Sequence, residues 1–397
     1  MQIELLLAAL GAATAAAPQP EAGEQNVVVT GIRTQDYRDR LAACLARRCP
    51  TDEDADATLA LAEALFLTGE YGEARQTVRE SIGRNRRRAA DYPEPVSDLF
   101  RAHSRLSRHL GFDDQAARSA NDILRALQAG LPQEDHRHFT ARLEIADLQM
   151  TMARYPGARR QLAELAQAAR RAGREDVAII AELRALWFSY VVAPSGTAKS
   201  RLTGMARLTA PDERIRSIGA RMVLARIYRA EGDAAGAEAL LAEVGRSGSS
   251  ARRRLIHSPA YQLSQQEVRF EQDQDIADPA TYRVGTGLRS VTENYEDKWI
   301  DVGFWILPDG HVSGLEVVRQ GSGTAWAGPL IDSIRGRVYS TAGEPSYRLE
   351  RYTFTADYRD GTGSHIRRRS PRGRIEFLDL TTPDAPPAPA PIQASPS

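Results

Sequence analysis

The residues of this 397-residue chain that could take part in catalysis are few and scattered. His136 and His138 stand beside Glu134 and Asp135 at an expected helix start, without the HExxH spacing of zinc proteases. His103 lies among leucines, where a packed histidine is more common than a ligand. We therefore expect a protein that is not an enzyme, with no cofactor and no metal site.

Three other segments carry only part of a chemical motif. The segment PSGTAKS at 194–200 is like a phosphate loop, but Ala198 replaces the glycine before the lysine. The GSG at 321–323 lacks the spacing of a nucleophile elbow. Asp301 and Asp309 fall on an expected strand and its turn, where a structural role is the first interpretation.

The two cysteines, Cys44 and Cys49, are expected to form a disulfide. On a regular helix they would face different sides, beyond disulfide reach. Pro50 changes this because it moves Cys49 away from helical geometry and lets the chain turn back. In an oxidising compartment a disulfide is the default for such a pair. Two cysteines without a nearby histidine make a poor zinc site.

Charge and composition narrow the choice of partners. Lys and Arg together equal Asp and Glu at 52 each, so no overall field favours nucleic acid or an acidic membrane surface. Arginine runs occur at Arg84 with 86–88, at 252–254, and at 367–369 with Arg372 and Arg374. We expect these to be solvated surface, with phosphate, lipopolysaccharide or an acidic protein patch as the alternative for the last run.

A helical array is expected from residue 36 to 245. Within 58–82, an apolar helical face ends at Phe66, the segment 69–71 makes a turn, and a second face begins at Ala74. The turn-plus-alanine pattern recurs, because Ala74, Ala116 and Ala158 are 42 residues apart and Ala237 follows.

The sequence of 58–82 resembles a tetratricopeptide (TPR) repeat, although the family's usual period is about 34 residues. We predict about ten helices, stacked as hairpins in a right-handed α-solenoid. A helical bundle is the alternative. Two further helical stripes support the pattern: Phe139, Leu143, Ala146 and Met150 form one, and Ile215, Ile218, Met222 and Ala225 form the other.

A different pattern begins at residue 298. Residues 300–306 alternate as in a strand with one buried face, and Pro308-Asp309-Gly310 makes a tight turn into a partner strand at 311–318. Trp326, Leu330 and Ile334 then follow at helical spacing, and 347–358 is a third strand.

This order, with its Asp-Gly hairpin, the Ser-Gly break before the helix and the aromatic last strand, resembles the C-terminal domain of TonB, the periplasmic energy transducer. The resemblance implies a small ββαβ domain that accepts an extended peptide at a sheet edge. Four residues are expected to matter at this sheet and its partner edge, mainly by holding the sheet: Phe304, Trp305, Tyr352 and Phe354. A further strand at 375–380 would block receptor binding if it covered that edge.

The N-terminal segment carries a second signal related to TonB. Residues 24–31, EQNVVVTG, resemble the TonB box that outer-membrane receptors offer to TonB. A short strand with chance similarity is the alternative. The expected partner-binding residues are Val27, Val28, Val29, Thr30 and Gly31. We expect this peptide to add as a strand to its own C-terminal sheet or to that of a true TonB.

Taken together, the sequence predicts a multidomain α+β protein, a TPR-like α-solenoid followed by a TonB C-terminal-like domain. The expected segments are a signal peptide at 1–17, an extended segment at 18–35, the helical repeat at 36–245, a linker and unassigned segment at 246–297, the C-terminal domain at 298–381 and a disordered Pro/Ala-rich tail at 382–397. The apolar run 5–17 is too short for a membrane span of about 20 residues.

The expected location is the periplasm of a Gram-negative bacterium, with an inner-membrane anchor as the alternative. The expected function is a non-catalytic, protein-binding adaptor or regulator in TonB-dependent outer-membrane transport. A TonB-like energy transducer and a cell-envelope or peptidoglycan-associated scaffold are the alternatives. Protein partners are expected on the solenoid's concave face, and TonB or one of its receptors is a candidate. No nucleic acid is expected, membrane contact would be peripheral at most, and the oligomeric state is open.

Overall fold

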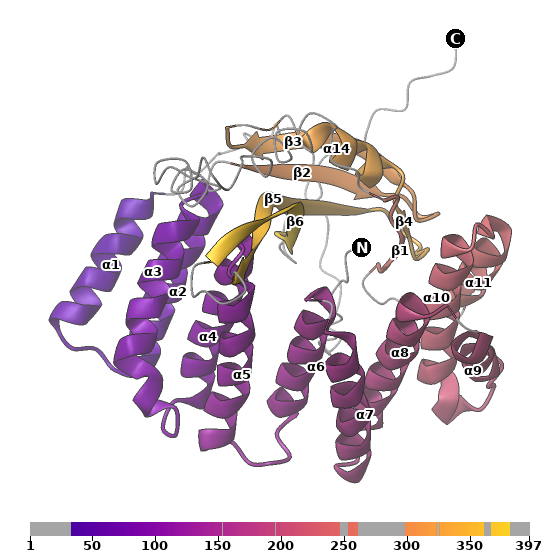
Figure 1. Ribbon diagram of the computed structural model, residues 1–397, viewed down its shortest axis with the longest axis horizontal. Helices are drawn as coiled ribbons and strands as arrows, with labels where there is room; N and C mark the ends of the chain where they lie inside the picture. Colours follow the sequence, from indigo (N-terminus) through magenta and orange to yellow (C-terminus); the bar gives the residue numbers. More distant parts are fainter. Residues whose placement is uncertain are drawn as a thin grey trace, which may run out of the picture.

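The computed structural model describes residues 33–152, 154–194, 196–246, 253–260, 298–322, 324, 326–360 and 367–381. A helix-rich N-terminal region is followed by a small antiparallel sheet domain, so the chain is an α+β multidomain protein (Figure 1). The expected signal peptide, the TonB-box-like residues 27–31 and the tail at 382–397 lie outside the described residues.

The N-terminal region consists of consecutive helices joined by short turns. Their bounds are α1 (Thr34–Ala46), α2 (Thr51–Thr68), α3 (Tyr71–Asn85), the 3-10 helix η1 (Arg86–Arg88), α4 (Pro93–His109), α5 (Asp113–Gly130), α6 (His136–Thr151), α7 (Tyr155–Arg171), α8 (Glu175–Val192), α9 (Gly196–Ala206), the 3-10 helix η2 (Pro211–Glu213), α10 (Arg214–Ala230) and α11 (Ala234–Arg246).

The alanines of the repeated pattern lie where neighbouring helices cross. Ala74, Ala116, Ala158 and Ala237 are all fully buried, each in the first turns of the second helix of a hairpin. A methyl side chain at these positions lets two helices approach closely. Gly69, at φ +90°, ends α2 in the left-handed conformation that glycine adopts at little cost.

The two predicted stripes have different outcomes. Phe139, Leu143, Ala146 and Met150 belong to one buried cluster between α6, α7 and α8, as expected. Met222 and Ala225 are buried against α11, but Ile215 is 63% exposed. The prediction for Ile215 is wrong because this residue lies in the first turn of α10, beyond the apolar contacts that α11 makes.

The C-terminal domain contains a four-stranded antiparallel sheet in the order β3-β2-β5-β6. Its elements are β2 (Trp299–Ile306), β3 (Val312–Gln320), α14 (Ala327–Arg335), β5 (Ser346–Asp360) and β6 (Arg367–Asp379). The Pro308-Asp309-Gly310 turn joins β2 to β3 as predicted, and Gly310 has φ +91°. Residues 375–379 of the predicted strand at 375–380 form the end of β6, which pairs with β5.

A second, two-stranded sheet pairs β1 (Leu255–His257) with β4 (Val338–Tyr339). The segment 246–297 was expected to be a linker and unassigned segment, yet residues 253–260 of it belong with the C-terminal strands. Ile256 and Val338 also pack on α10 and α11, so β1 connects the end of the helical array to the sheet domain.

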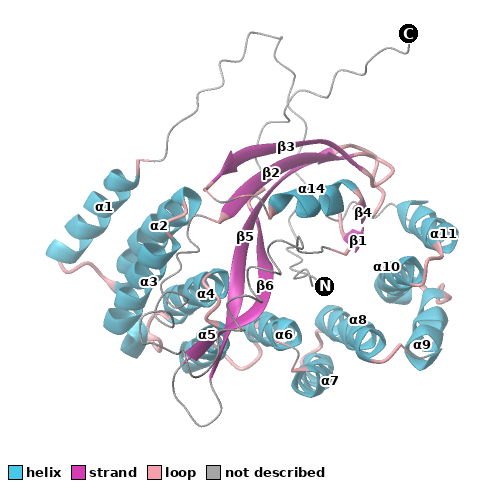
Figure 2. Ribbon diagram, turned by 45° about the horizontal axis from the view of Figure 1, so that its top comes forward, coloured by secondary structure: helices cyan, strands magenta, loops and turns pink. Residues whose placement is uncertain are grey.

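The large sheet is the middle layer of three. Its upper face packs on α14, through Val302, Phe304 and Tyr352 against Leu330 and Ile334. Its other face lies over the helix ends at α2–α5 (Figures 1 and 2). Every residue of β2 is therefore buried, and the expectation of only one buried face on this strand is wrong.

The helices in the described part of the chain were compared with the length and hydropathy of a membrane span, and none of them reaches both.

Candidate functional site

The four aromatic residues predicted for a partner edge lie instead on inner strands. Phe304 is on β2 and Tyr352 and Phe354 are on β5, all three in the core beneath α14. Trp305 contacts the ring of Tyr347 at a centroid distance of 5.5 Å. Because β2 and β5 each have a strand on both sides, these residues lie away from an open edge, in positions that fit their expected main role of holding the sheet.

Strand addition at the edge of β5, the route that the TonB resemblance implies, is closed. From Glu350 to Asp360, β5 pairs with β6. Strand β6 also contacts the helices, because Arg374 forms an ion pair with Asp113 and donates to the carbonyl oxygen of Arg108 at 2.8 Å. This arginine was expected to be solvated, and the ion pair shows that it is a structural contact.

A buried guanidinium group joins the sheet to the end of α2. Arg351 on β5 is fully buried and pairs with Asp301 on β2. It also donates to the carbonyl oxygens of Phe66 and Leu67, at 2.6 and 2.9 Å, at the end of α2. Its guanidinium carbon lies 3.8 Å from the ring centroid of Trp299. A buried charge is tolerated only when it is paired and hydrogen-bonded, as it is here.

A second group of contacts surrounds Thr353 on β5. Its hydroxyl lies 3.0 Å from the hydroxyl of Tyr71 and 3.1 Å from Nδ1 of His109. Burial, with a smaller effect of nearby Arg108, lowers the pKa of His109 to about 3. The imidazole is therefore neutral at neutral pH, and its position depends on the sheet lying over it.

The outer strand β3 is the most open part of the sheet. Most of its residues are exposed, including Val317 at 39% and Val318 at 45%. Among the described residues it pairs only with β2. The register shifts twice along this pairing, and Gly314 adopts φ +59° near the second shift. An outer strand presents unpaired N–H and C=O groups that another strand can bind.

Cys44 and Cys49 form the predicted disulfide, with Cα atoms 5.2 Å apart. The helix α1 ends at Ala46, and Arg48 adopts φ +55°, which turns the chain back before Pro50. Cys44 is buried against α2, so the bond joins the first helix to the rest of the array.

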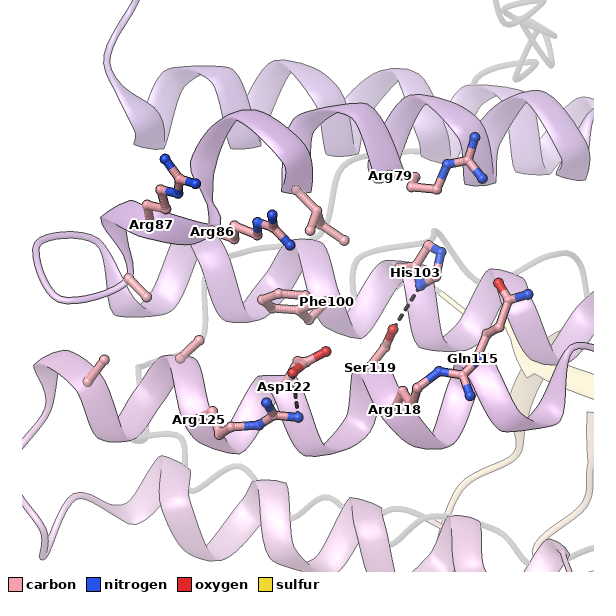
Figure 3. A pocket seen from close by; sticks show the side chains of 14 residues that line it. Arg79, Arg86, Arg87, Phe100, His103, Gln115, Arg118, Ser119, Asp122 and Arg125 are labelled. Atoms are coloured by element: carbon pink, nitrogen blue, oxygen red, sulfur yellow. Dashed lines mark hydrogen bonds and ion pairs between the residues drawn. The ribbon is translucent and has the colours of Figure 1, made fainter.

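A pocket of about 690 Å³ opens between α3, α4 and α5 (Figure 3). We call it the arginine pocket because five arginines line it: Arg79, Arg86, Arg87, Arg118 and Arg125. Asp122 is the one carboxylate among its lining residues, and it forms an ion pair of 2.7 Å with Arg125. Phe100 lies in the middle of the pocket and gives it an apolar surface.

The four other arginines of the pocket have no ion pair with a carboxylate anywhere in the described part of the chain. The run at Arg84 and 86–88 was expected to be only solvated surface. Arg84 instead pairs with the buried Asp54 at 2.7 Å, whereas Arg86 and Arg87 line the pocket.

His103 is buried, as the sequence predicted, but it also lines the arginine pocket. Its Nδ1 lies 2.8 Å from Oγ of Ser119, and its Nε2 has no hydrogen-bond partner. Burial, followed by the charges of Arg75 and Arg79, lowers its pKa to about 4. The ring is therefore neutral at neutral pH and can present one N–H donor.

Part of this pocket could be predicted from the sequence of α5. Gln115, Arg118, Asp122 and Arg125 follow a spacing of three, four and three, which places them on one face of α5. The spacing does not show that α3 and α4 bring further arginines to the same place. Among the described residues, no group of three or more His, Cys, Asp or Glu side chains is placed to hold a metal ion.

No protein-family model matches the chain, and no curated protein matches it significantly. Among solved structures, one similar chain is that in the crystal structure of BtubC (BKLC) from P. vanneervenii. The two share 14% sequence identity at a TM-score of 0.41, over 60% of this chain and 99% of the other. This similarity is too low to transfer fold or function.

Proposed function

We propose that this chain is a periplasmic, non-catalytic protein-binding adaptor or regulator of TonB-dependent outer-membrane transport. In this proposal a TPR-like α-solenoid carries a ββαβ domain of TonB C-terminal type. Helix hairpins that cross at the buried Ala74, Ala116 and Ala158 support the first assignment. The order β2-β3-α14 followed by β5 supports the second.

The observation that carries the proposal is the outer strand β3. Val317 and Val318 are exposed apolar residues on a strand with one partner in the described part of the chain. An extended peptide can bind there through main-chain hydrogen bonds, with its alternate side chains against the valines. The register shifts keep each straight stretch of β3 short. A partner of a few residues therefore fits better than a long strand.

The proposed peptide is of the TonB-box type, as in residues 24–31 of this chain. Three consecutive valines favour the extended backbone that strand addition needs. The segment could act on its own sheet or be offered to another protein, so a test must separate these cases.

The test uses the full chain carrying Val28→Asp. This change places a charge in the middle of the segment 24–31, so that the chain's own segment should no longer pair with the sheet. A synthetic EQNVVVTG peptide should bind this protein in isothermal titration calorimetry, and EQNVDVTG should not. Adding Val318→Lys should abolish binding, because a charged side chain on an edge strand opposes pairing. The matched control, Val192→Lys, changes a valine of similar exposure, 42%, on α8.

Binding of EQNVVVTG that Val318→Lys does not weaken would place the peptide elsewhere. Equal binding of both peptides, or of neither, would contradict the proposal. Loss of binding with both Val318→Lys and Val192→Lys would indicate a general effect on the fold instead of a contact at β3.

A further inference from the structure

The arginine pocket is not needed for strand addition, because its lining residues come from the helical array and not from the sheet. Its lining is unbalanced in charge, with five arginines and one aspartate. That aspartate already has a partner in Arg125. Neighbouring guanidinium groups repel one another, so the arrangement favours an anion between them.

A second, independent observation points the same way. His103 is 8% exposed, and its Nε2 has no partner. When the Ser119 hydroxyl donates to Nδ1, the proton of the neutral ring lies on Nε2, which then needs an acceptor. A buried donor without an acceptor is unfavourable. Arg79 and Arg118 lie on either side of this histidine and serine (Figure 3).

We propose that the arginine pocket binds the phosphate of an organic phosphomonoester, with the apolar or aromatic part of the ligand against Phe100. The fork of a guanidinium group matches two phosphate oxygens, and a phosphomonoester has three oxygens and about two negative charges. Arg79, Arg118 and Nε2 of His103 supply the donors for them. A carboxylate has two oxygens and one charge and would leave more of these donors unused.

The size of the pocket agrees with a small ligand. Its volume of about 690 Å³ is within the usual range of roughly 300–1,000 Å³ for small-molecule sites. The side chains of Phe100, Ile82 and Ala126 provide the apolar lining. The phosphate can belong to a soluble ester or to a lipid headgroup, and both share this chemistry.

The test is isothermal titration calorimetry on the full chain with phenyl phosphate as the probe. Arg79→Gln and Arg118→Gln should each weaken binding about tenfold, the loss of one charge-assisted contact. Both residues are exposed, so the variants should fold. Arg160→Gln, which changes an exposed arginine on α7, is the matched control and should bind as the unchanged protein does. Asp122→Asn removes the only carboxylate of the lining and should tighten binding several-fold.

Two further probes identify the source and the class of the ligand. Vesicles containing phosphatidic acid test for a lipid phosphate; their binding, weakened by Arg79→Gln, supports the proposal with the lipid as the source. A penta-glutamate peptide tests for an acidic protein segment. Stronger binding of this peptide than of either phosphate probe would overturn the proposal, as would unchanged binding in Arg79→Gln and Arg118→Gln. None of these results depends on peptide addition at β3.

Discussion

Lowering the pH from 7 to 5 should destabilise this protein through His109, the histidine that the sheet covers. The unfolded chain exposes this imidazole, whose ordinary pKa is about 6.5. In the folded protein its pKa is about 3, because burial and then the charge of Arg108 disfavour the protonated form. Below pH 6.5 the unfolded state therefore takes up a proton that the folded state refuses.

The size of the effect follows from proton linkage. Above pH 6.5 His109 is neutral in both the folded and the unfolded state, so it does not make the free energy of unfolding depend on pH. Between pH 6.5 and pH 5 the free energy of unfolding falls by about 2 kcal/mol, and the loss continues until the pH approaches the folded pKa of about 3. His103, with a pKa of about 4, should add a similar loss at pH 5.

The assay is urea unfolding of the unchanged protein and of His109→Gln at pH 7 and pH 5, with circular dichroism as the signal for unfolding. Glutamine can keep a hydrogen bond to Thr353 but does not titrate. The variant will be less stable at pH 7, because the ring of His109 lies 4.9 Å from that of Phe66 and this contact is lost. Between pH 7 and pH 5, however, it should lose about 2 kcal/mol less than the unchanged protein.

His136→Gln, which changes an exposed histidine on α6, is the control for the substitution itself and should leave the stability at pH 7 nearly unchanged. An identical pH dependence of His109→Gln and the unchanged protein would refute the reasoning. In that case His109 would be open to water, and the sheet would not lie on the turn between α4 and α5.

Three other substitutions test the fold. Arg351→Met should cost about 3–5 kcal/mol, because it removes a fully buried partner of Asp301 and two hydrogen bonds to α2. Ala158→Leu should cost about 1–3 kcal/mol, because a fully buried alanine at a helix crossing leaves no room for a larger side chain. Replacing Cys44 and Cys49 by serine should cost about 2 kcal/mol, the loop entropy of a short disulfide ring. All three are measured by urea unfolding.

Each of these has a matched control. Arg319→Gln removes the other partner of Asp301, but that side chain is 39% exposed, so it should cost less than about 1 kcal/mol. Ala230→Leu enlarges an exposed alanine at the end of α10 and should be nearly neutral. A reducing agent should lower the stability of the unchanged protein and leave the serine variant as it is. Equal costs in variant and control would contradict the assigned contact.

Patterns among residues that are close in the sequence were sufficient to predict much of the architecture. The helix hairpins could be predicted because apolar residues at helical spacing, a turn and an alanine at the crossing are all neighbours in the chain. The hairpin from β2 to β3 followed from alternation and from Pro308-Asp309-Gly310. The disulfide followed from two nearby cysteines and Pro50, which sequence order alone brings together.

The position of the sheet could not be predicted in this way. Asp301 alternates with apolar residues and was expected to face away from the core, yet it is buried because Arg351 and the end of α2 cover it. Arg351 and Tyr71 are 280 residues apart in the chain. No local pattern records a contact at that separation, so the burial of both faces of β2 depends on tertiary structure.

In the arginine pocket, too, one part could be predicted from the sequence and another part depends on tertiary structure. The sequence determined which face of α5 carries Arg118, Asp122 and Arg125, because helical spacing alone sets a side chain's direction. Only the packing of α3 and α4 beside α5 decided that Arg79 and His103 join them around one space. Periodicity fixes which way a side chain points, whereas its neighbours depend on how whole helices pack.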